Sequence, residues 1–297
     1  MNDGPLVSVI MAAYNGEGLI GESIESVLAQ TYEPIELIVV DDCSSDGTAT
    51  VVEDYVRRYP GRVRLARQDS RAGPCRRRND ALDLAQGELI AWLDQDDLWL
   101  PEKTEREVAV LASEPDVGLV YTGYEAFDSE SGDVLEWRDR SIEAEGDVLA
   151  PLFLHGAFIA SLTVLFRREA MTARGLRLRE TDFSFGDDYF LWLAIALDWR
   201  VARIDEVLAR YRRHQANESL RLAGTNFHAR RVELLEEFLA AFPEARPRLG
   251  RARRAGLADH HLRAAHFEQG RRHRGRAARH VLQALRHDPA RTIRALV

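Results

Sequence analysis

The amino-acid sequence predicts an α/β fold, a doubly wound and mostly parallel sheet that is followed by a C-terminal helical region. Two observations support this fold class. Over about the first hundred residues, β-rich runs alternate with runs of helical periodicity, the order expected when helices cover both faces of a parallel sheet. From residue 226 onward, apolar residues recur only at helical spacing. We therefore expect two parts, residues 1–225 and residues 226–297.

The individual elements follow from short apolar runs that end in turn residues. In chain order we expect strands at residues 7–13, 35–40, 63–65 and 89–93, and helices at residues 19–30 and 51–56, while residues 81–85 lie on a further helix. Thr50 and Glu53 are spaced as a capping box for the helix at residues 51–56. A later helix is expected at residues 189–198, with Asp187 mainly as its cap.

Polar clusters follow three of these strands. Tyr14-Asn15 ends the first strand, Asp41-Asp42 the second, and Asp94-Gln95-Asp96-Asp97 the strand at residues 89–93. In such a sheet ligands bind beyond the carboxyl ends of the strands, so the clusters should meet at one edge. Neighbouring carboxylates repel one another unless a cation lies among them, and a hard divalent cation most often holds substrate phosphates. The sequence therefore predicts chemistry on a nucleotide diphosphate, although Asp41 and Asp42 could also be turn residues.

A glycine pattern at the first turn indicates a competing kind of site. Residues 16–21 match G-x-G-x-x-G, and Asp41 lies twenty residues beyond the last glycine, as in dinucleotide sites. We reject this interpretation for three reasons. Tyr14-Asn15 separate the strand from the first glycine, Glu17 would place a carboxylate beside the pyrophosphate, and the acidic cluster at residues 94–97 would have no role.

Composition limits the class of protein. The chain has 297 residues, a hydrophobic content of 45% and only two cysteines, Cys43 and Cys75, which fits a packed core in a reducing compartment. Its start shows no basic segment followed by an apolar one, so we expect no signal peptide and a cytoplasmic location.

The C-terminal part is basic although the net charge of the chain is −8. From Pro243 to the end there are 14 arginines against four acids. These arginines could bind anionic lipid headgroups at the inner face of the membrane, a lipid diphosphate acceptor, or the acidic body of the same or another chain in an oligomer, or could simply form a solvated surface. Nucleic acid is excluded as a partner because base-stacking aromatic residues are nearly absent there.

At this point the sequence resembles a known family, the family 2 glycosyltransferases of GT-A fold, whose sheet is Rossmann-like. The resemblance covers about residues 6–220 and rests on the following runs: residues 7–15, 26–32, 36–42, 78–79, 85–90, 93–97, 186–193 and 208–219. Residues 1–110 would then form the donor half and residues 111–225 the acceptor half. The sequence departs from the family at Cys43, at Asp187, where glutamate is commoner, and at Arg76 and Arg77, which replace small residues.

The resemblance implies roles for residues of the donor site. Asp96 would ligate Mn²⁺ or Mg²⁺, Asp94 would contact the ribose or the metal, and Asp97 would support them, unless it is a turn residue. Asp42 would accept a hydrogen bond from a pyrimidine base. The other residues that we assign to donor binding are Ala12, Tyr14, Asn15, Glu17, Arg78 and Gln95.

Two further residues complete the expected site. Asp188 matches the catalytic base of the family, which would take the proton of the acceptor hydroxyl in a single displacement with inversion. His214 lies in an Arg-rich loop and could reach the metal or a phosphate, since imidazole suits a borderline ion such as Mn²⁺, or could be structural. Residues 155–165 should line the acceptor side.

We therefore expect a metal-dependent inverting glycosyltransferase that uses a nucleotide sugar, with UDP-sugar first, on a saccharide or lipid-linked acceptor in cell-surface polysaccharide or glycolipid synthesis. Two alternatives stay open: a non-catalytic nucleotide-sugar binding protein, and a nucleotidyltransferase on a similar sheet. A nucleotidyltransferase would be expected to carry a glycine-rich loop with a catalytic Lys or Arg near the N-terminus, whereas the only lysine of the chain is Lys103.

Overall fold

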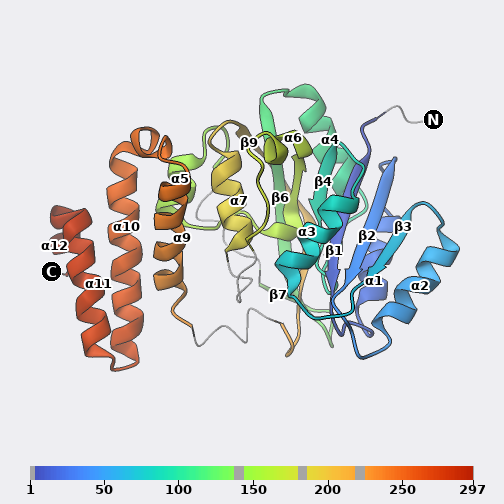
Figure 1. The fold of residues 1–297 in the computed structure, drawn as a ribbon, viewed down its shortest axis with the longest axis horizontal. Helices are drawn as coiled ribbons and strands as arrows, with labels where there is room; N and C mark the ends of the chain where they lie inside the picture. The colour runs from blue at the N-terminus through green and yellow to red at the C-terminus, as the bar shows by residue number, and fades with distance from the viewer. Residues whose placement is uncertain (1–3, 137–143, 180–185, 218–224, 297) are drawn as a thin grey trace.

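The structure, a computed structural model, describes residues 4–136, 144–179, 186–217 and 225–296. The predicted alternation of strands and helices forms one large sheet with helices on both faces (Figure 1). The strands, in chain order, are β1 (Val7–Ala13), β2 (Ile35–Asp41), β3 (Val63–Arg67), β4 (Leu89–Trp92), β5 (Leu98–Trp99), β6 (Val117–Asp128), β7 (Val134–Glu136), β8 (Val164–Arg167) and β9 (Arg200–Arg213).

The sheet has a parallel half and a mixed half. Its strand order is β3-β2-β1-β4-β8-β6-β9-β5, with β7 paired to β6. β3, β2, β1 and β4 run parallel, β8 is antiparallel to both β4 and β6, and β9 returns parallel to β6. The parallel half contains the clusters at the strand ends, so the predicted doubly wound, mostly parallel sheet is confirmed where it positions the site.

Helices on both faces of the sheet are followed by the helices of the C-terminal part (Figure 1). They are α1 (Ile20–Leu28), α2 (Thr48–Arg58), α3 (Pro74–Leu84), α4 (Lys103–Ser113), α5 (Leu149–His155), α6 (Arg168–Thr172), α7 (Asp187–Ile195), α9 (Phe227–Ala241), α10 (Ala245–Gly270), α11 (Arg274–His287) and α12 (Pro289–Leu296), with the 3₁₀ turn η1 (Ser161–Thr163) before β8.

Alternate residues of β1 belong to different cores. Val9 and Met11 lie in a buried cluster with residues of α1 and α2, whereas Ile10 lies in a second cluster with residues of α3 and α7. Successive side chains of a strand point to opposite faces, so a strand buried on both faces is apolar throughout. This is why the run at residues 7–13 has no polar alternation.

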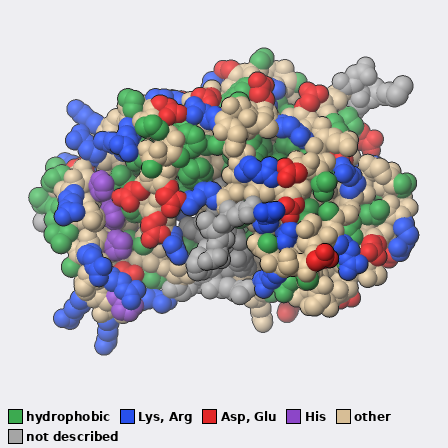
Figure 2. Space-filling model, viewed as in Figure 1, with side chains coloured by type: hydrophobic (Ala, Val, Ile, Leu, Met, Phe, Trp, Pro, Cys, Tyr) green, Lys and Arg blue, Asp and Glu red, His purple; other side chains and the backbone are tan. Residues whose placement is uncertain are grey.

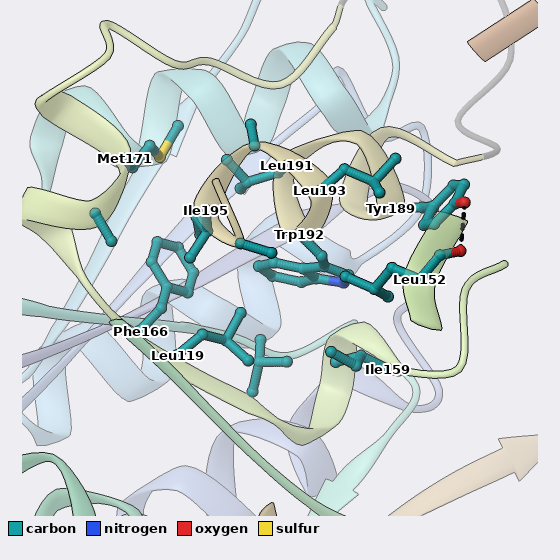
Figure 3. Close-up of a cluster of buried hydrophobic side chains, with 14 of the residues drawn as sticks. Leu119, Leu152, Ile159, Phe166, Met171, Tyr189, Leu191, Trp192, Leu193 and Ile195 are labelled. Carbon is teal, nitrogen blue, oxygen red and sulfur yellow. Dashed lines mark hydrogen bonds between the residues drawn. The ribbon is translucent and has the colours of Figure 1, made fainter. Parts of the chain in front are cut away.

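Helix α7 is fixed to the sheet by aromatic side chains (Figure 3). The ring centroids of Trp92 and Trp192 lie 5.1 Å apart. Phe166 lies 5.8 Å from Trp192, with an angle of 67° between the ring planes. The hydroxyl of Tyr189 donates a 2.8 Å hydrogen bond to the carbonyl of Leu152. α7 therefore contacts β4 through Trp192 and α5 through Tyr189.

The C-terminal helices begin against this core and then extend away from it (Figure 1). Leu235 and Phe238 of α9, like Leu249 of α10, are buried in the same cluster as Trp192. α10 is interrupted at Gly250, whose φ of 48° lies outside the helical region. None of the described helices combines the length and the hydrophobicity needed to cross a bilayer.

Two local predictions about helix starts were wrong. α2 begins at Thr48, two residues before the predicted capping box, because the Asp46 carboxylate accepts a 3.0 Å hydrogen bond from the backbone N–H of Thr48. α7 begins at Asp187 itself, and Gly186, with a φ of 86°, takes the capping position. In α2 an upstream side chain bonds the first backbone N–H of the helix, and in α7 an upstream glycine adopts the left-handed conformation that precedes the helix.

Candidate active site

The predicted clusters lie at one edge of the sheet. β1 pairs in parallel register with both β2 and β4, so Ala13 is opposite Asp41, and Ile10 is opposite Trp92. All three strands therefore end on the same side, where Tyr14 and Asp42 follow β1 and β2 directly and Asp94 follows β4 after one residue.

Asp42 is held in a buried ion pair with Arg77. Its Oδ1 accepts hydrogen bonds from Arg77 Nε at 2.6 Å and from the N–H of Ala72 at 2.8 Å, and its Oδ2 accepts one from the N–H of Gly73 at 2.8 Å. Both side chains are about 5% exposed. A carboxylate oxygen has two lone pairs, so Oδ2 keeps one for a further donor. Asp42 thus fixes the loop before α3 and can still accept one hydrogen bond.

Arg77 was not assigned to the site from the sequence. The guanidinium also donates to Asp80 at 2.6 Å and to the carbonyl of Ser70 at 2.8 Å. Its place among three arginines, Arg76 to Arg78, gave no sign of which one would be buried. The available signal was Asp42 itself, since a carboxylate at the end of a buried strand requires a donor.

The Gln95 side chain connects the ends of β4 and β1 through two hydrogen bonds to the backbone of Tyr14. Its amide accepts from the N–H of Tyr14 and donates to the carbonyl of Tyr14, each at 2.9 Å. The Tyr14 ring is partly exposed, and the Arg71 guanidinium lies 4.1 Å from its centroid. Tyr14 therefore has a fixed backbone, and Arg71 covers one face of its ring.

Asn15 and Glu17 also bind a neighbouring loop. Asn15 Oδ1 accepts a 2.9 Å hydrogen bond from the N–H of Ser45, and the Glu17 carboxylate accepts one of the same length from the N–H of Gly47. Both contacts join the turn after β1 to the turn before α2. Ala12, inside β1 opposite Val40, is partly exposed at the same edge.

Each aspartate of the acidic cluster has a different partner. Asp94 accepts a 2.5 Å hydrogen bond from Arg78, and Asp96 Oδ2 lies 2.8 Å from His214 Nε2. Asp97 is buried and accepts a 2.9 Å bond from the N–H of Arg212. Burial, together with repulsion from Asp96 and Asp94, raises the pKa of Asp97 well above its usual range. Asp97 is therefore enclosed, whereas Asp94 and Asp96 lie at partly exposed positions of the edge.

His214 and Asp96 form the part of the cluster best suited to a cation. The two side chains are 118 residues apart in sequence, and each is about one fifth exposed. His214 directly follows β9. The end of β9 is held beside the acidic cluster because the Arg212 guanidinium donates a 2.8 Å hydrogen bond to the carbonyl of Asp96. Asn217 then donates to the carbonyl of Arg212 at 3.1 Å, which holds the loop after β9.

Asp188 lies in the first turn of α7, and its Oδ1 accepts a 2.7 Å hydrogen bond from the N–H of Tyr189. Burial raises the pKa of Asp188, and repulsion from Asp94 adds to this effect, although that hydrogen bond and the charge of Arg78 oppose it. Burial disfavours the charge of Arg78, but Asp94, Cys75 and Asp188 together raise its pKa. Arg78 therefore couples the acidic cluster to Asp188.

Arg231 of α9 also faces this region, and the sequence gave no local sign of it. Its guanidinium lies 5.7 Å from the centroid of the Tyr189 ring. Burial lowers the pKa of Arg231, and the nearby Asp188 acts in the opposite direction. A residue of the C-terminal part thus contributes positive charge beside the first turn of α7.

The sequence of the chain is similar to those of known glycosyltransferases. The family described as Glycosyl transferase family 2 matches residues 8–174. The UDP-Glc:alpha-D-GlcNAc-diphosphoundecaprenol beta-1,3-glucosyltransferase WfgD of Escherichia coli is 32% identical over 225 residues, which cover 73% of this chain and 81% of WfgD. The putative teichuronic acid biosynthesis glycosyltransferase TuaG of Bacillus subtilis (strain 168) is 32% identical over 209 residues, which cover 70% of this chain and 79% of TuaG.

Solved structures share the fold at lower sequence identity. TarS of S. aureus in complex with UDP-GlcNAc has a TM-score of 0.60 at 18% identity, over 89% of this chain and 83% of that one. The mannosyltransferase PcManGT of Pyrobaculum calidifontis, in complex with GDP-Man and Mn²⁺, has a TM-score of 0.59 at 20% identity, over 99% and 80% of the two chains. These likenesses support the GT-A fold. With the family match over more than half of its length and WfgD above 30% identity, the chain belongs to glycosyl transferase family 2.

Proposed function

We propose that this glycosyltransferase moves a sugar, with inversion, from a nucleotide diphosphate sugar to an acceptor hydroxyl, and that the donor is a UDP-sugar. One observation carries the proposal. Arg78 is paired with Asp94 in the acidic cluster and also acts electrostatically on Asp188 at the start of α7. A donor diphosphate at the cluster and a base at Asp188 would therefore lie close enough to act on one reacting carbon. The name of WfgD, which specifies UDP-Glc, supports the choice of donor.

The nucleotide would bind at the carboxyl ends of the strands in the parallel half of the sheet. The free lone pair of Asp42 Oδ2 would accept the N–H of a pyrimidine base, and the base would stack on Tyr14 on the face that Arg71 leaves open. Ala12 would bond the base through its backbone. Because the contacts of Asn15, Glu17 and Gln95 hold the loops around the site, we infer that these three act by shaping it.

Asp96, Asp94 and His214 would hold the divalent cation. Asp96 and His214 fit such an ion because a carboxylate and an imidazole from separate segments already meet at 2.8 Å, whereas Asp94 is paired with Arg78 and would have to turn toward the ion. An imidazole ligand favours Mn²⁺ over Mg²⁺, which prefers oxygen alone. When bound, the ion would act as a Lewis acid that stabilises the charge of the departing diphosphate.

Asp188 would act as the general base. As the acceptor oxygen forms its bond to the anomeric carbon, the bond from that carbon to the phosphate oxygen breaks, and the acceptor proton passes to the Asp188 carboxylate. The nucleoside diphosphate leaves with the bonding electrons. The raised pKa of Asp188 suits this step because a stronger base takes the proton more readily. Residues 155–165 remain our prediction for the acceptor side.

We further propose a lipid-linked acceptor and peripheral contact with the inner face of the membrane. Three large apolar side chains on α11 and α12 are more than half exposed, Leu282, Ile293 and Leu296. Exposed arginines at helical spacing flank them, among them Arg279 and Arg286 on the face of Leu282. Exposed apolar side chains among arginines are typical of helices that lie on anionic membranes. The names of WfgD and TuaG support a role in cell-surface polysaccharide synthesis.

The reaction is tested with nucleotide sugars and Mn²⁺. Thermal-shift screening identifies the donor, and release of nucleoside diphosphate then measures turnover. We expect Asp188→Asn to reduce turnover by about 10²–10⁴-fold while donor binding persists, because only the base is lost. Asp96→Ala should abolish the Mn²⁺-dependent part of donor binding. Asp205→Asn, at a side chain that is 85% exposed, is the matched control. Near-normal turnover of Asp188→Asn would refute the assignment of the base.

The same assay separates the alternatives. A binding protein would bind the donor without releasing nucleoside diphosphate, and a nucleotidyltransferase would release pyrophosphate from a nucleoside triphosphate.

The membrane proposal is tested separately with vesicles that contain phosphatidylglycerol. Changing Leu282, Ile293 and Leu296 to serine should abolish co-sedimentation, whereas Leu84→Ser, at an exposed leucine of α3, should not. Equal binding of both variants would refute it.

A further inference from the structure

Three C-terminal helices bring together potential metal ligands that are distant in sequence from the acidic cluster at residues 94–97. Glu236 of α9, His261 of α10 and His287 of α11 each offer one ligand atom, and these atoms all lie within 4.8 Å of one another. Figure 2 shows a row of histidine side chains along the C-terminal helices, with acidic side chains beside it. The chain has nine histidines, and four of them, at residues 266, 273, 280 and 287, recur every seventh position.

His261 has one ring nitrogen that lacks a partner in the described part of the chain. Its side chain is buried, and its Nε2 is fully enclosed without a hydrogen bond. The other nitrogen, Nδ1, lies 3.1 Å from Nδ1 of His280. A buried polar atom without a partner is costly. An imidazole with one nitrogen within hydrogen-bond distance of a neighbour and the other unbonded can bind a metal in the usual way, because ligating histidines generally donate their second N–H to a neighbour.

The spacing needs only a small contraction to accept an ion. A point equidistant from three atoms 4.8 Å apart lies about 2.8 Å from each, whereas Zn–N and Zn–O bonds are about 2.0–2.2 Å. Each side chain would therefore move by less than ~1 Å. The rings of His261 and His287 are 5.5 Å apart and within 14° of parallel, so His287, which is only partly buried, must also rotate about its Cβ–Cγ bond.

The ligand set selects the class of cation. Two imidazoles and one carboxylate suit Zn²⁺ and its neighbours among the transition metals, whereas Mg²⁺ and Ca²⁺ require mostly oxygen. The Glu236 carboxylate supplies negative charge, which offsets the nearby Arg253. Glu236 is exposed, so water can complete a fourth position.

We propose that Glu236, His261 and His287 form a second metal site, specific for Zn²⁺-like cations, that links α9, α10 and α11. His280 is a positioning residue that fixes the ring of His261. Because the three ligands come from different helices, the ion binds the folded arrangement and not the unfolded chain, and it stabilises this part of the protein by mass action. The site lies outside the proposed donor site and has no step in sugar transfer.

The test uses the full chain with the Asp96→Ala change, so that the proposed donor site no longer contributes. After removal of metal with a chelator, Co²⁺ serves as a spectroscopic probe and Zn²⁺ as its competitor. We expect one equivalent of Co²⁺ to give visible absorption bands of a low-coordinate site, Zn²⁺ to displace it, and saturating Zn²⁺ to raise the melting temperature by several degrees.

Variants of the proposed ligands decide the result. His287→Gln should weaken binding by more than ~100-fold and remove the thermal shift, whereas His266→Gln, at an exposed histidine of α10, should change neither. Glu236→Gln, at an exposed position of α9, gives a second test if His287→Gln does not fold. Absence of Co²⁺ bands in the parent, or bands that both ligand variants retain, would overturn the proposal.

Discussion

At the residue scale, Asp42 shows that a site residue and a structural residue can be the same side chain. The sequence predicted a strand-end carboxylate available to a base, and the carboxylate is instead largely used by Arg77 and two backbone N–H groups. Local pattern could place Asp42 after β2, but its partner lies 35 residues further on. The same limit applied to His214, whose contact with Asp96 depends on how β9 crosses the sheet.

Replacing Arg77 should destabilise the whole chain. Arg77→Met leaves a buried carboxylate without its counter-ion, and breaking one side of a buried pair costs about 3–5 kcal/mol. Because two backbone donors remain on Asp42, we expect the lower end of this range in the free energy of urea unfolding. Arg76→Met is the control, since its side chain is half exposed and its ion pair with Asp80 is worth less than about 1 kcal/mol. Equal losses in both variants would contradict the structural role of Arg77.

The pH dependence of turnover should report on Asp188. A general base acts only when deprotonated, so the rate falls as pH decreases through its pKa. Burial and Asp94 raise that pKa, which places the acid limb above the usual titration range of an aspartate. Asp94→Asn removes one repelling charge and should move the limb to lower pH, whatever it does to the maximal rate. The pH of half-maximal rate is therefore the quantity to measure, and a limb that does not move would argue against Asp188 as the base.

At the element scale, strands and helices were predictable where one chemical pattern decided them. β1 and β2 are buried on both faces, so their unbroken apolar runs could be assigned directly. The start of α2 was predicted two residues late because Thr50 and Glu53 form a plausible capping pair, whereas in the structure Asp46 accepts a hydrogen bond from the N–H of Thr48. The two-stranded pairing of β5 with β9 was not predicted, since it depends on contacts between distant segments.

Helix α4 contains a buried ion pair whose energetics can be tested. Lys103 donates to both carboxylate oxygens of Glu107 at 2.8 Å, and its ammonium lies 4.3 Å from the centroid of the Trp99 ring. Glu107→Gln should lower the free energy of unfolding by about 3–5 kcal/mol because a buried charge loses its partner. The double change to Lys103→Met and Glu107→Leu should restore most of this loss. A double variant as unstable as the single one would contradict this account.

The pH dependence of stability gives an independent check on the same pair. Burial raises the pKa of Glu107 to about 7, although Lys103 opposes this. Between the ordinary carboxyl range and that value, the folded chain retains a proton that the unfolded chain has released. The contribution of this group to stability therefore falls as pH rises through this window. The fall should be absent in the double variant.

At the scale of the whole molecule, the charge pattern predicted a distinct C-terminal part but not how its helices join the rest of the chain. A basic composition suggested an appended tail, yet α9 places Leu235 and Phe238 in the same buried cluster as Trp192 of α7. It also brings Arg231 beside Tyr189. Helical periodicity reveals which face of α9 is apolar, but not which surface covers that face. This is why the contribution of α9 to the site could not be predicted.

Two truncations should separate the roles of the C-terminal helices. A chain that ends at residue 225 loses the buried apolar side chains of α9, each worth about 1.5–3 kcal/mol, and the sum is comparable to the total stability of a typical domain. We expect it to be insoluble or unfolded by circular dichroism. A chain that ends at Gly270 loses α11 and α12, in which the only buried residues are Ala277, Ala284 and Thr292.

The chain that ends at Gly270 should therefore stay folded and retain sugar transfer, with a melting temperature lower by a few degrees. It should lose both vesicle binding and the stabilisation by Zn²⁺. Melting curves, transfer assays, vesicle sedimentation and Co²⁺ titration on the two truncations provide the measurements. A folded and active chain of residues 1–225 would show that α9 is dispensable. If the chain that ends at Gly270 is folded but no longer transfers sugar, α11 or α12 contributes to catalysis, contrary to the assignment of the site to the strand ends and α7.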